Sequence, residues 1–237
     1  MLSDIFRSAG TTVMSHTPVA TLDSAAIWGS LLTNKILILA ATALMLINLL
    51  DTMRIFPQLL FCLRRPYGSE TLEHSVSLAR MRNNTAAFCV IPFCLMIDQS
   101  ALFRPQLWDM IPAMWSSAAT IVLLLAYLAL RDIMFSAFRM RRIGLEASGA
   151  ARHCQWNFFI LLCILMLVSC GISVCLGLPA TVTRKVYLVE IGLFFLISLL
   201  RTSQIFGSHC SGLQTILYLC ALEILPAAAI VVCAVLF

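Results

Sequence analysis

Glu223 has the greatest potential for chemistry in this chain, because it is a carboxylate deep inside a long apolar run. It lies about ten residues into the run 213–237, which at 1.5 Å per residue places it ~15 Å deep, near the centre of a bilayer. An ionised carboxylate at that depth costs at least ~2.5 kcal/mol, so we expect it to face a bundle interior, protonated or paired. Pro226 leaves the carbonyl of Leu222 without its helical donor and creates a polar notch beside Glu223.

Two roles fit Glu223. It can form an ion or proton site, or a polar contact to a partner. Alternatively, it joins helices by hydrogen bonding to Tyr218, Asn48 or another span. We favour the structural role, because buried polar groups hold membrane helices together more often than they form sites.

Glu190 is a second carboxylate in an apolar run, but a shallower one. It lies one turn into the expected span 186–200, close in sequence to Arg184 and Lys185. A shallow carboxylate beside cations favours an interfacial ion pair over a binding site.

Asp98 lies near the outer end of the expected span 85–103, and Arg104 is its nearest partner in sequence. Asp98, Glu190 and Glu223 could together line a polar path from the midplane to the outer surface. Nothing in the sequence brings the three together, so this path is a hypothesis only.

No catalytic or cofactor-binding pattern accompanies these carboxylates. The pairs His153-Cys154 and His209-Cys210 match no zinc or haem spacing, and no CxxC pair occurs. The nucleophile elbow, the P-loop, HExxH and the dinucleotide glycine fingerprint are also missing from the sequence. We therefore expect a non-enzymatic protein with no cofactor and no metal site.

The composition indicates whether the chain is surrounded by water or by a lipid bilayer. The chain is 61% hydrophobic and only 11% charged, with a mean hydropathy of +0.95. Soluble domains are about 45–50% apolar and about 25% charged, so the chain is expected in a bilayer. Its net charge of +5 comes from arginines at the ends of apolar runs, which favours contact with lipid headgroups over nucleic acid.

The expected fold is all-α, a polytopic transmembrane bundle of about six helices forming a single domain over residues 25–237. Residues 1–24 lack a continuous apolar run and are expected to form a non-cytoplasmic tail. The expected spans are 27–50, 85–103, 110–130, 157–178, 186–200 and 213–237.

The orientation follows from the distribution of positive charge. The loops on one side of the expected bundle hold eleven of the sixteen lysines and arginines. Since positive charge stays in the cytoplasm, both termini should be non-cytoplasmic in a bacterial inner membrane. On the cytoplasmic side, residues 55–63 predict a short amphipathic helix in the headgroup region. Across 131–156, the arginines predict either a basic helix face on anionic lipid, Arg131 included, or an ordinary solvated extension.

Small residues at every second position mark the fourth expected span as a packing surface. They are Ser169, Gly171, Ser173, Cys175 and Gly177. The spacing of Ser169 and Ser173 lets helices approach closely, within the monomer or between subunits.

The stretch 218–226 (YLCALEILP), from Tyr218 to Pro226, resembles the last helix of an uncharacterised multi-pass membrane family of Bacteroidota-type bacteria, catalogued as a domain of unknown function. The layout of 27–237 is also similar, including an aromatic-rich helix that follows Arg152. The resemblance implies an inner-membrane location and the same span plan, and it supplies no activity. The arginine-rich, lysine-poor composition departs from the family.

Two functions remain open at this point. The leading hypothesis is a non-enzymatic accessory or scaffold subunit of an inner-membrane complex, with the lipid bilayer and a membrane-protein partner or second copy as its contacts. The alternative is a small transporter or proton-coupled carrier that uses Glu223.

Overall fold

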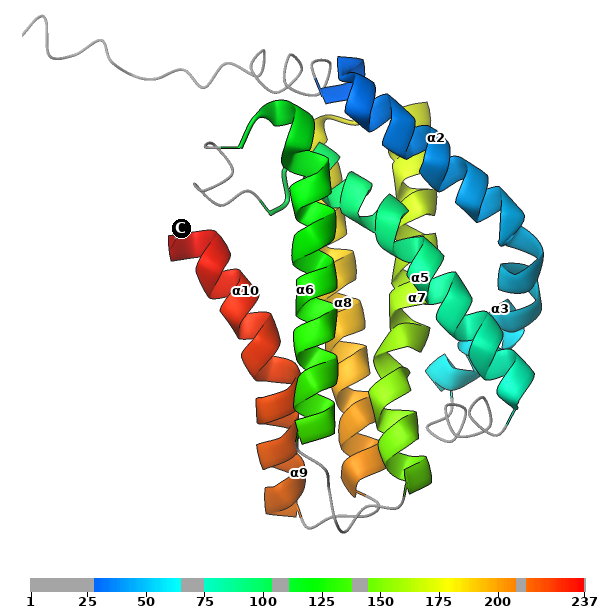
Figure 1. The fold of residues 1–237 in the computed structure, drawn as a ribbon, viewed down its shortest axis with the longest axis vertical. Coiled ribbons are helices and arrows are strands. Elements are labelled where there is room, and N and C mark those ends of the chain that lie inside the picture. Colours follow the sequence, from blue (N-terminus) through cyan, green and yellow to red (C-terminus); the bar gives the residue numbers. More distant parts are fainter. Residues whose placement is uncertain (1–27, 65–74, 104–110, 138–144, 208–211, 237) are drawn as a thin grey trace, which may run out of the picture.

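The computed structural model describes residues 28–64, 75–103, 111–137, 145–207 and 212–236, and within them every regular element is helical. The all-α class is therefore confirmed for this part of the chain. The principal helices (Figure 1) are α2 (Leu32–Ile47), α3 (Leu49–Arg64), α5 (Val76–Gln99), α6 (Ser116–Ala137), α7 (Leu145–Cys175), α8 (Ala180–Gly207), α9 (Gly212–Leu219) and α10 (Leu225–Leu236). A short 3₁₀ turn, η2 (Ala113–Trp115), leads into α6, and a π-helix, η3 (Cys220–Ile224), joins α9 to α10.

Helix α7 packs along α8, and α5 crosses α7 at an angle (Figure 1). Helix α6 runs in nearly the same direction as α7 and α8 in this view, and it packs on α5. The start of α2, the start of α6, the turn between α7 and α8 and the end of α10 all lie toward one end of the molecule. This alternation is compatible with a bundle that crosses a membrane repeatedly.

Three helical stretches are long and apolar enough to cross a bilayer: Ala113–Ser136, His153–Cys175 and Ala180–Gly207. Helices α2 and α3 add a fourth if they count as one broken span, since they are bent by 67°. The described residues thus support a membrane protein with three or four spans, and the expected number of six is not confirmed.

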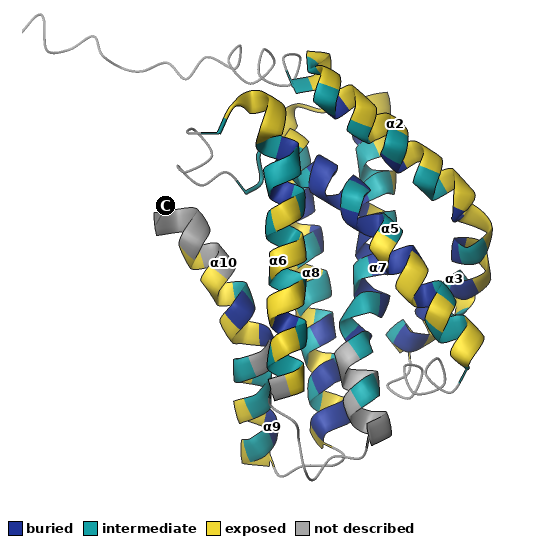
Figure 2. Ribbon diagram, in the orientation of Figure 1, coloured by how far each residue is buried: buried dark blue, intermediate teal, exposed yellow. Residues whose placement is uncertain are grey.

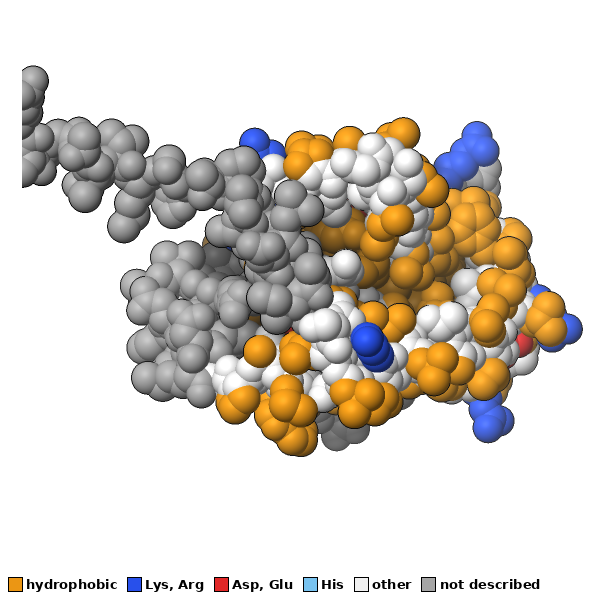
Figure 3. All heavy atoms as spheres, turned by 90° about the horizontal axis from the view of Figure 1, so that it is seen from above, with side chains coloured by type: hydrophobic (Ala, Val, Ile, Leu, Met, Phe, Trp, Pro, Cys, Tyr) orange, Lys and Arg blue, Asp and Glu red, His pale blue; other side chains and the backbone are white. Residues whose placement is uncertain are grey.

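The surface of the described helices is largely apolar, as a lipid solvent requires. Leu39, Val174 and Leu200 are 74%, 75% and 62% exposed, far more than large side chains in a water-soluble core. Figure 3 shows hydrophobic side chains spread over one end of the molecule and lining a hollow there, with lysine and arginine at the edges. Buried residues gather where α5, α7 and α8 meet (Figure 2).

Two expected spans differ from the helices that the structure contains. The fifth, 186–200, lies within the much longer helix α8, which has 28 residues. The second, 85–103, starts nine residues too late: α5 begins at Val76 and carries Arg82 inside the bundle. Arg82 is fully buried and donates to Asn83 Oδ1 at 3.1 Å, so it does not lie in a solvated loop as expected.

The first expected span, 27–50, ends early because the chain turns at Asn48. The Asn48 side chain donates to Thr85 Oγ1 at 2.9 Å, and this bond joins the bend to α5. The expected amphipathic helix 55–63 lies within α3, where Ile55 is buried and Arg54 is exposed. Its place in the headgroup region stays a prediction.

The last expected span, 213–237, is three helical segments rather than one. The backbone N–H of Leu225 bonds to the carbonyl of Cys220, five residues back, which closes the wider ring of a π-helix. Pro226 follows directly and has no N–H to continue the α-helical ladder. The chain therefore accommodates one extra residue per turn at the position of Glu223.

Candidate functional site

Glu223 and Arg131 form an ion pair inside the bundle. Arg131 Nη2 lies 2.6 Å from Glu223 Oε1, and the two side chains are 2% and 3% exposed. A charge-assisted hydrogen bond of this length in a dry environment is strong. Glu223 is thus both buried and paired.

The helices on either side explain why these two side chains meet. Arg131 lies on α6, and its guanidinium also lies 4.7 Å from the centre of the Phe135 ring, one turn further along. Glu223 lies in η3, where the π-helical turn changes the direction of the side chains relative to α9 and α10. Both elements are needed to place the pair.

Of the three expected kinds of partner for Glu223, the structure shows the third, a residue of another span. The Tyr218 ring packs beside Phe206, 6.2 Å between centroids, and Asn48 bonds to Thr85, so neither of these is its partner. Arg131 was expected either on anionic lipid or in a solvated extension. Helix α6 does continue beyond Leu130, to Ala137, but both placements of the Arg131 side chain are wrong, because it is buried against Glu223.

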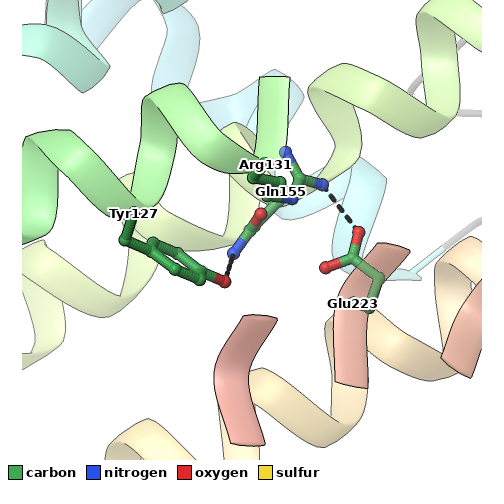
Figure 4. A network of polar contacts seen from close by, with 4 residues as sticks. All are labelled: Tyr127, Arg131, Gln155 and Glu223. Atoms are coloured by element: carbon green, nitrogen blue, oxygen red, sulfur yellow. Dashed lines mark hydrogen bonds and ion pairs between the residues drawn. The ribbon is translucent and has the colours of Figure 1, made fainter. Parts of the chain in front are cut away.

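A second polar contact lies beside the ion pair. Tyr127 is one helical turn before Arg131 on α6, and its hydroxyl accepts a hydrogen bond from Gln155 Nε2 of α7 at 3.5 Å. Figure 4 shows Tyr127, Gln155, Arg131 and Glu223 converging from three segments of the chain. The Gln155 carbonyl oxygen, Oε1, is buried and has no hydrogen-bond partner among the described residues.

Tyr127 and Gln155 also line a cavity of about 180 Å³ between α5, α6, α7 and α8. A third polar residue, Ser198, lines it, and its hydroxyl is buried without a hydrogen-bond partner in the described structure. The remaining lining residues are apolar or aromatic: Phe93, Leu124, Leu128, Trp156, Phe158, Phe159, Leu162, Ile191, Phe194 and Phe195. Buried polar groups normally have partners, so these two atoms are exceptions that lie close to the cavity.

Pro226 is buried in the first turn of α10, three residues beyond Glu223. It contributes no side-chain chemistry. Its role in the site is to end the normal helical hydrogen bonding where the carboxylate must turn toward α6.

Glu190 is not part of this cluster, and it is not an interfacial ion pair. Its carboxylate accepts a short hydrogen bond from Ser169 of α7, while Arg184 and Lys185 are exposed. The expected pairing fails because the cations lie on the outer side of α8 and Glu190 faces α7. The second carboxylate oxygen of Glu190 is buried without a partner in the described residues.

The environment of Asp98 differs from those of Glu223 and Glu190. It accepts hydrogen bonds from Trp28 Nε1, Ser116 Oγ and Ser117 Oγ, each at 2.6 Å. Ser117 Oγ also lies 2.8 Å from Asn34 Oδ1, so its single hydrogen is shared between two acceptors. Arg104, the expected partner, lies outside the described residues.

The three carboxylates do not line one path in this structure. Ser117 contacts Asp98 and Arg131 contacts Glu223, and the fourteen residues between these positions on α6 span ~21 Å. Glu190 bonds between α7 and α8, away from both contacts. Each carboxylate has its own local partners, and one oxygen of Glu190 has none among the described residues.

Sequence reasoning missed Arg131, Tyr127, Gln155 and Ser198. One signal was available: Tyr127 and Arg131 are four residues apart, so they share a face of any helix that contains both. Arg131 was placed on a helix face that meets lipid or solvent, because the apolar run ends at Leu130, and its relation to Tyr127 was not used.

The histidine and cysteine pairs form no metal site in the described structure. Cys154 is fully buried in the core, while His209 and Cys210 lie outside the described residues. Among described residues, no group of three or more histidine, cysteine or acidic side chains could hold a metal ion.

Comparison of the chain with family models, with curated proteins and with solved structures finds no match. The resemblance of Tyr218–Pro226 to the Bacteroidota-type family therefore stays a prediction. The functional argument rests on the geometry of the chain itself.

Proposed function

We propose that this protein is an integral membrane carrier that binds a small molecule in the cavity beside Tyr127 and Gln155, and that the Arg131–Glu223 pair couples binding to a proton. The observation that carries the proposal is the position of the pair beside Tyr127 and Gln155, which line the cavity (Figure 4). The chain is non-enzymatic in this proposal and needs no cofactor.

Burial of the Arg131–Glu223 ion pair costs free energy. Burying two charges costs several kcal/mol per ion, so a buried pair is weak evidence for stability alone. Ionisable residues within membrane segments instead mark ion and proton pathways in many proteins. The pair is therefore better explained as a switch, which changes state when Glu223 takes up a proton, than as a contact that only stabilises the fold.

Protonation of Glu223 supplies the switch. A neutral carboxyl group holds the Arg131 guanidinium less strongly, because the charge–charge attraction is lost. Gln155 lies beside Arg131 (Figure 4), and its free carbonyl oxygen is an acceptor that the released guanidinium can use. Protonation would thus change the polar wall of the cavity and the contact between η3 and α6.

The accessory-subunit hypothesis has weaker support. One of its grounds was the small-residue face of the fourth expected span, but Ser169 bonds to Glu190 and Ser173 is buried within the chain. Part of that face is therefore used internally and is not available to a partner. Location in a bacterial inner membrane, six spans, non-cytoplasmic termini and contact of exposed Arg54, Arg64 and Arg80 with anionic headgroups remain proposals.

The decisive experiment asks whether the cavity opens to both sides of the membrane. Ser198→Cys places a thiol in the cavity wall, and a membrane-impermeant maleimide is applied to right-side-out and to inverted vesicles. Peptide mass spectrometry then reads labelling at position 198. We expect labelling from both sides, and a several-fold change in the ratio between the sides when Glu223→Gln is added.

Native Cys163 is the matched control, because it is fully buried in the core and should stay unlabelled in both preparations. Failure of position 198 to label from either side would overturn the carrier. Equal labelling with and without Glu223→Gln would contradict the proposed coupling to a proton.

A further inference from the structure

An open pocket of about 670 Å³ lies between α3 and the start of α5. It shares no lining residue with the cavity beside Tyr127, so it is a separate candidate site. Its lining residues are Asp51, Val76, Ser77, Arg80, Met81 and Asn84.

Two opposite charges line this pocket without neutralising each other. Asp51 lies in the first turn of α3 and Arg80 in the second turn of α5, and they form no ion pair with each other in the described structure. Asp51 is half-buried and Arg80 is exposed, so both side chains are accessible from the pocket. An anion would meet the carboxylate of Asp51, and a cation would meet the guanidinium of Arg80. A zwitterion is attracted by both groups.

The α5 side of the pocket suits a phosphate group. The Arg80 guanidinium can donate two parallel hydrogen bonds to phosphate oxygens. Val76 and Ser77 belong to the first helical turn, which contains no acidic residue and where backbone N–H groups favour an anion. Asn84 lies one turn beyond Arg80 on the same face and offers an amide N–H. The negative end of the zwitterion is therefore expected on α5.

The α3 side of the pocket suits a primary ammonium group. The carboxylate of Asp51 accepts hydrogen bonds from N–H, and none of the residues that line the pocket is aromatic. A quaternary ammonium group such as choline has no N–H and is bound by aromatic side chains. The pocket therefore favours ethanolamine over choline.

The position of the pocket along α5 is that of lipid headgroups. The helix is apolar from Ala86 to Ile97, and Arg80 lies fewer than two helical turns before this stretch. A basic residue just outside an apolar stretch of a membrane helix lies at the bilayer surface. Leu50 and Met53, close to Asp51 on α3, are 71% and 64% exposed, so acyl chains have an apolar surface nearby.

We infer that this pocket binds the headgroup of a phosphoethanolamine lipid. The phosphate lies against Arg80 and the first turn of α5, and the ammonium group lies against Asp51. The inference goes beyond the headgroup contact of Arg80 proposed above, because Asp51 makes the site select a zwitterion over an anion. It is independent of the carrier, since none of these residues lines the cavity that contains Ser198.

The test compares phosphatidylethanolamine, phosphatidylcholine and phosphatidylglycerol with identical acyl chains. The full chain is reconstituted in nanodiscs with equal amounts of the three lipids and transferred to detergent, and native mass spectrometry then quantifies the complexes with one bound lipid. We expect phosphatidylethanolamine to be enriched about 3- to 10-fold over each of the others, the effect of two partly exposed charge contacts. Equal retention of all three, or stronger retention of phosphatidylglycerol, would overturn the inference.

Asp51→Asn removes the carboxylate and keeps the size of the side chain. It should bring the ratio of phosphatidylethanolamine to phosphatidylglycerol close to unity, and an unchanged ratio would show the inference to be wrong. Arg80→Gln should lower the retention of all three lipids, because each carries the phosphate. Arg54→Gln is the matched control, since Arg54 is exposed on α3 and does not line the pocket. It should leave the ratios unchanged.

Glycerophosphoethanolamine, the headgroup without acyl chains, tests whether the ligand is a lipid. At millimolar concentration we expect it to leave the retention of phosphatidylethanolamine unchanged, and displacement would assign the pocket to a soluble zwitterion instead. If either Asp51→Asn or Arg80→Gln does not fold, the other decides, because each removes one of the two charge contacts. Neither variant alters the cavity wall, so the labelling of Ser198→Cys from the two sides tests the carrier separately.

Discussion

Asp98 and Glu223 contact α6 at Ser117 and Arg131, positions ~21 Å apart along the helix, and the two carboxylates are held in different ways. Asp98 meets three neutral donors, which come from Trp28 near the start of the described chain and from the first turn of α6. Glu223 meets a single cation, Arg131, at comparable distance. The first arrangement ties several segments together near one end of the bundle. The second places two opposite charges where no water reaches them.

The difference indicates which region is built for stability and which for change. Three neutral donors share the carboxylate of Asp98, so the loss of any one of them removes only part of its stabilisation. At Glu223 one proton abolishes the whole charge–charge attraction. The polar atoms left without partners near the pair, on Gln155 and Ser198, have no counterpart around Asp98 in the described residues. Mutations can test this contrast directly.

The largest effect is expected for Arg131→Met, which leaves the carboxylate of Glu223 buried and without its cation. Removal of one partner of a buried pair typically destabilises a protein by about 3–5 kcal/mol. We expect a loss of free energy of unfolding in that range, measured by titration with SDS in mixed micelles.

The double variant Arg131→Met, Glu223→Leu is the control, because replacement of both charges by apolar groups removes the desolvation cost. Its stability should return to within about 1 kcal/mol of the wild type. If the double variant is as unstable as the single one, the pair is a brace and not a switch, and the contrast with Asp98 disappears.

A smaller loss is expected for Asp98→Ala. Two of its three donors, Trp28 and Ser116, are only partly buried, so water can replace part of what they lose, and we expect a loss of about 1–2 kcal/mol. Asp98→Asn keeps one carbonyl acceptor and should lose about half as much. If Asp98→Ala lowers the free energy of unfolding as much as Arg131→Met does, the proposed difference between the two regions is wrong.

The positions of these residues show what the sequence could and could not predict. Apolar run length placed the helices α6, α7 and α8, because about 20 apolar residues in a row have few other uses. It failed at α5, since Arg82 is buried against other helices and its charge mimics a loop in a hydropathy profile. The burial of Glu223 in the bundle was predicted from its position inside the last apolar run, and the structure confirms it.

The partners of the carboxylates could not be predicted from the sequence, because pairing depends on how each helix is rotated about its axis in the bundle. Arg131 follows the last residue of an apolar run, and only the packed bundle turns it inward. Arg184 and Lys185 are the reverse case: they are near Glu190 in sequence but point outward from α8. Periodicity predicts which residues share a face of one helix, and it does not predict which helix that face meets.

Glu190 sharpens the comparison, because it has one neutral donor where Asp98 has three and Glu223 has a cation. Ser169→Ala removes that donor and should cost only about 0.6 kcal/mol, the average for hydrogen bonds between membrane helices. Ser173→Ala is the control, since it removes a buried hydroxyl one turn further along α7 that does not bond to Glu190 in the described structure. The two variants are compared by SDS titration under the conditions used for Arg131→Met. A loss above about 2 kcal/mol for Ser169→Ala alone would place Glu190 with Glu223, as a carboxylate whose single partner controls the packing of two helices.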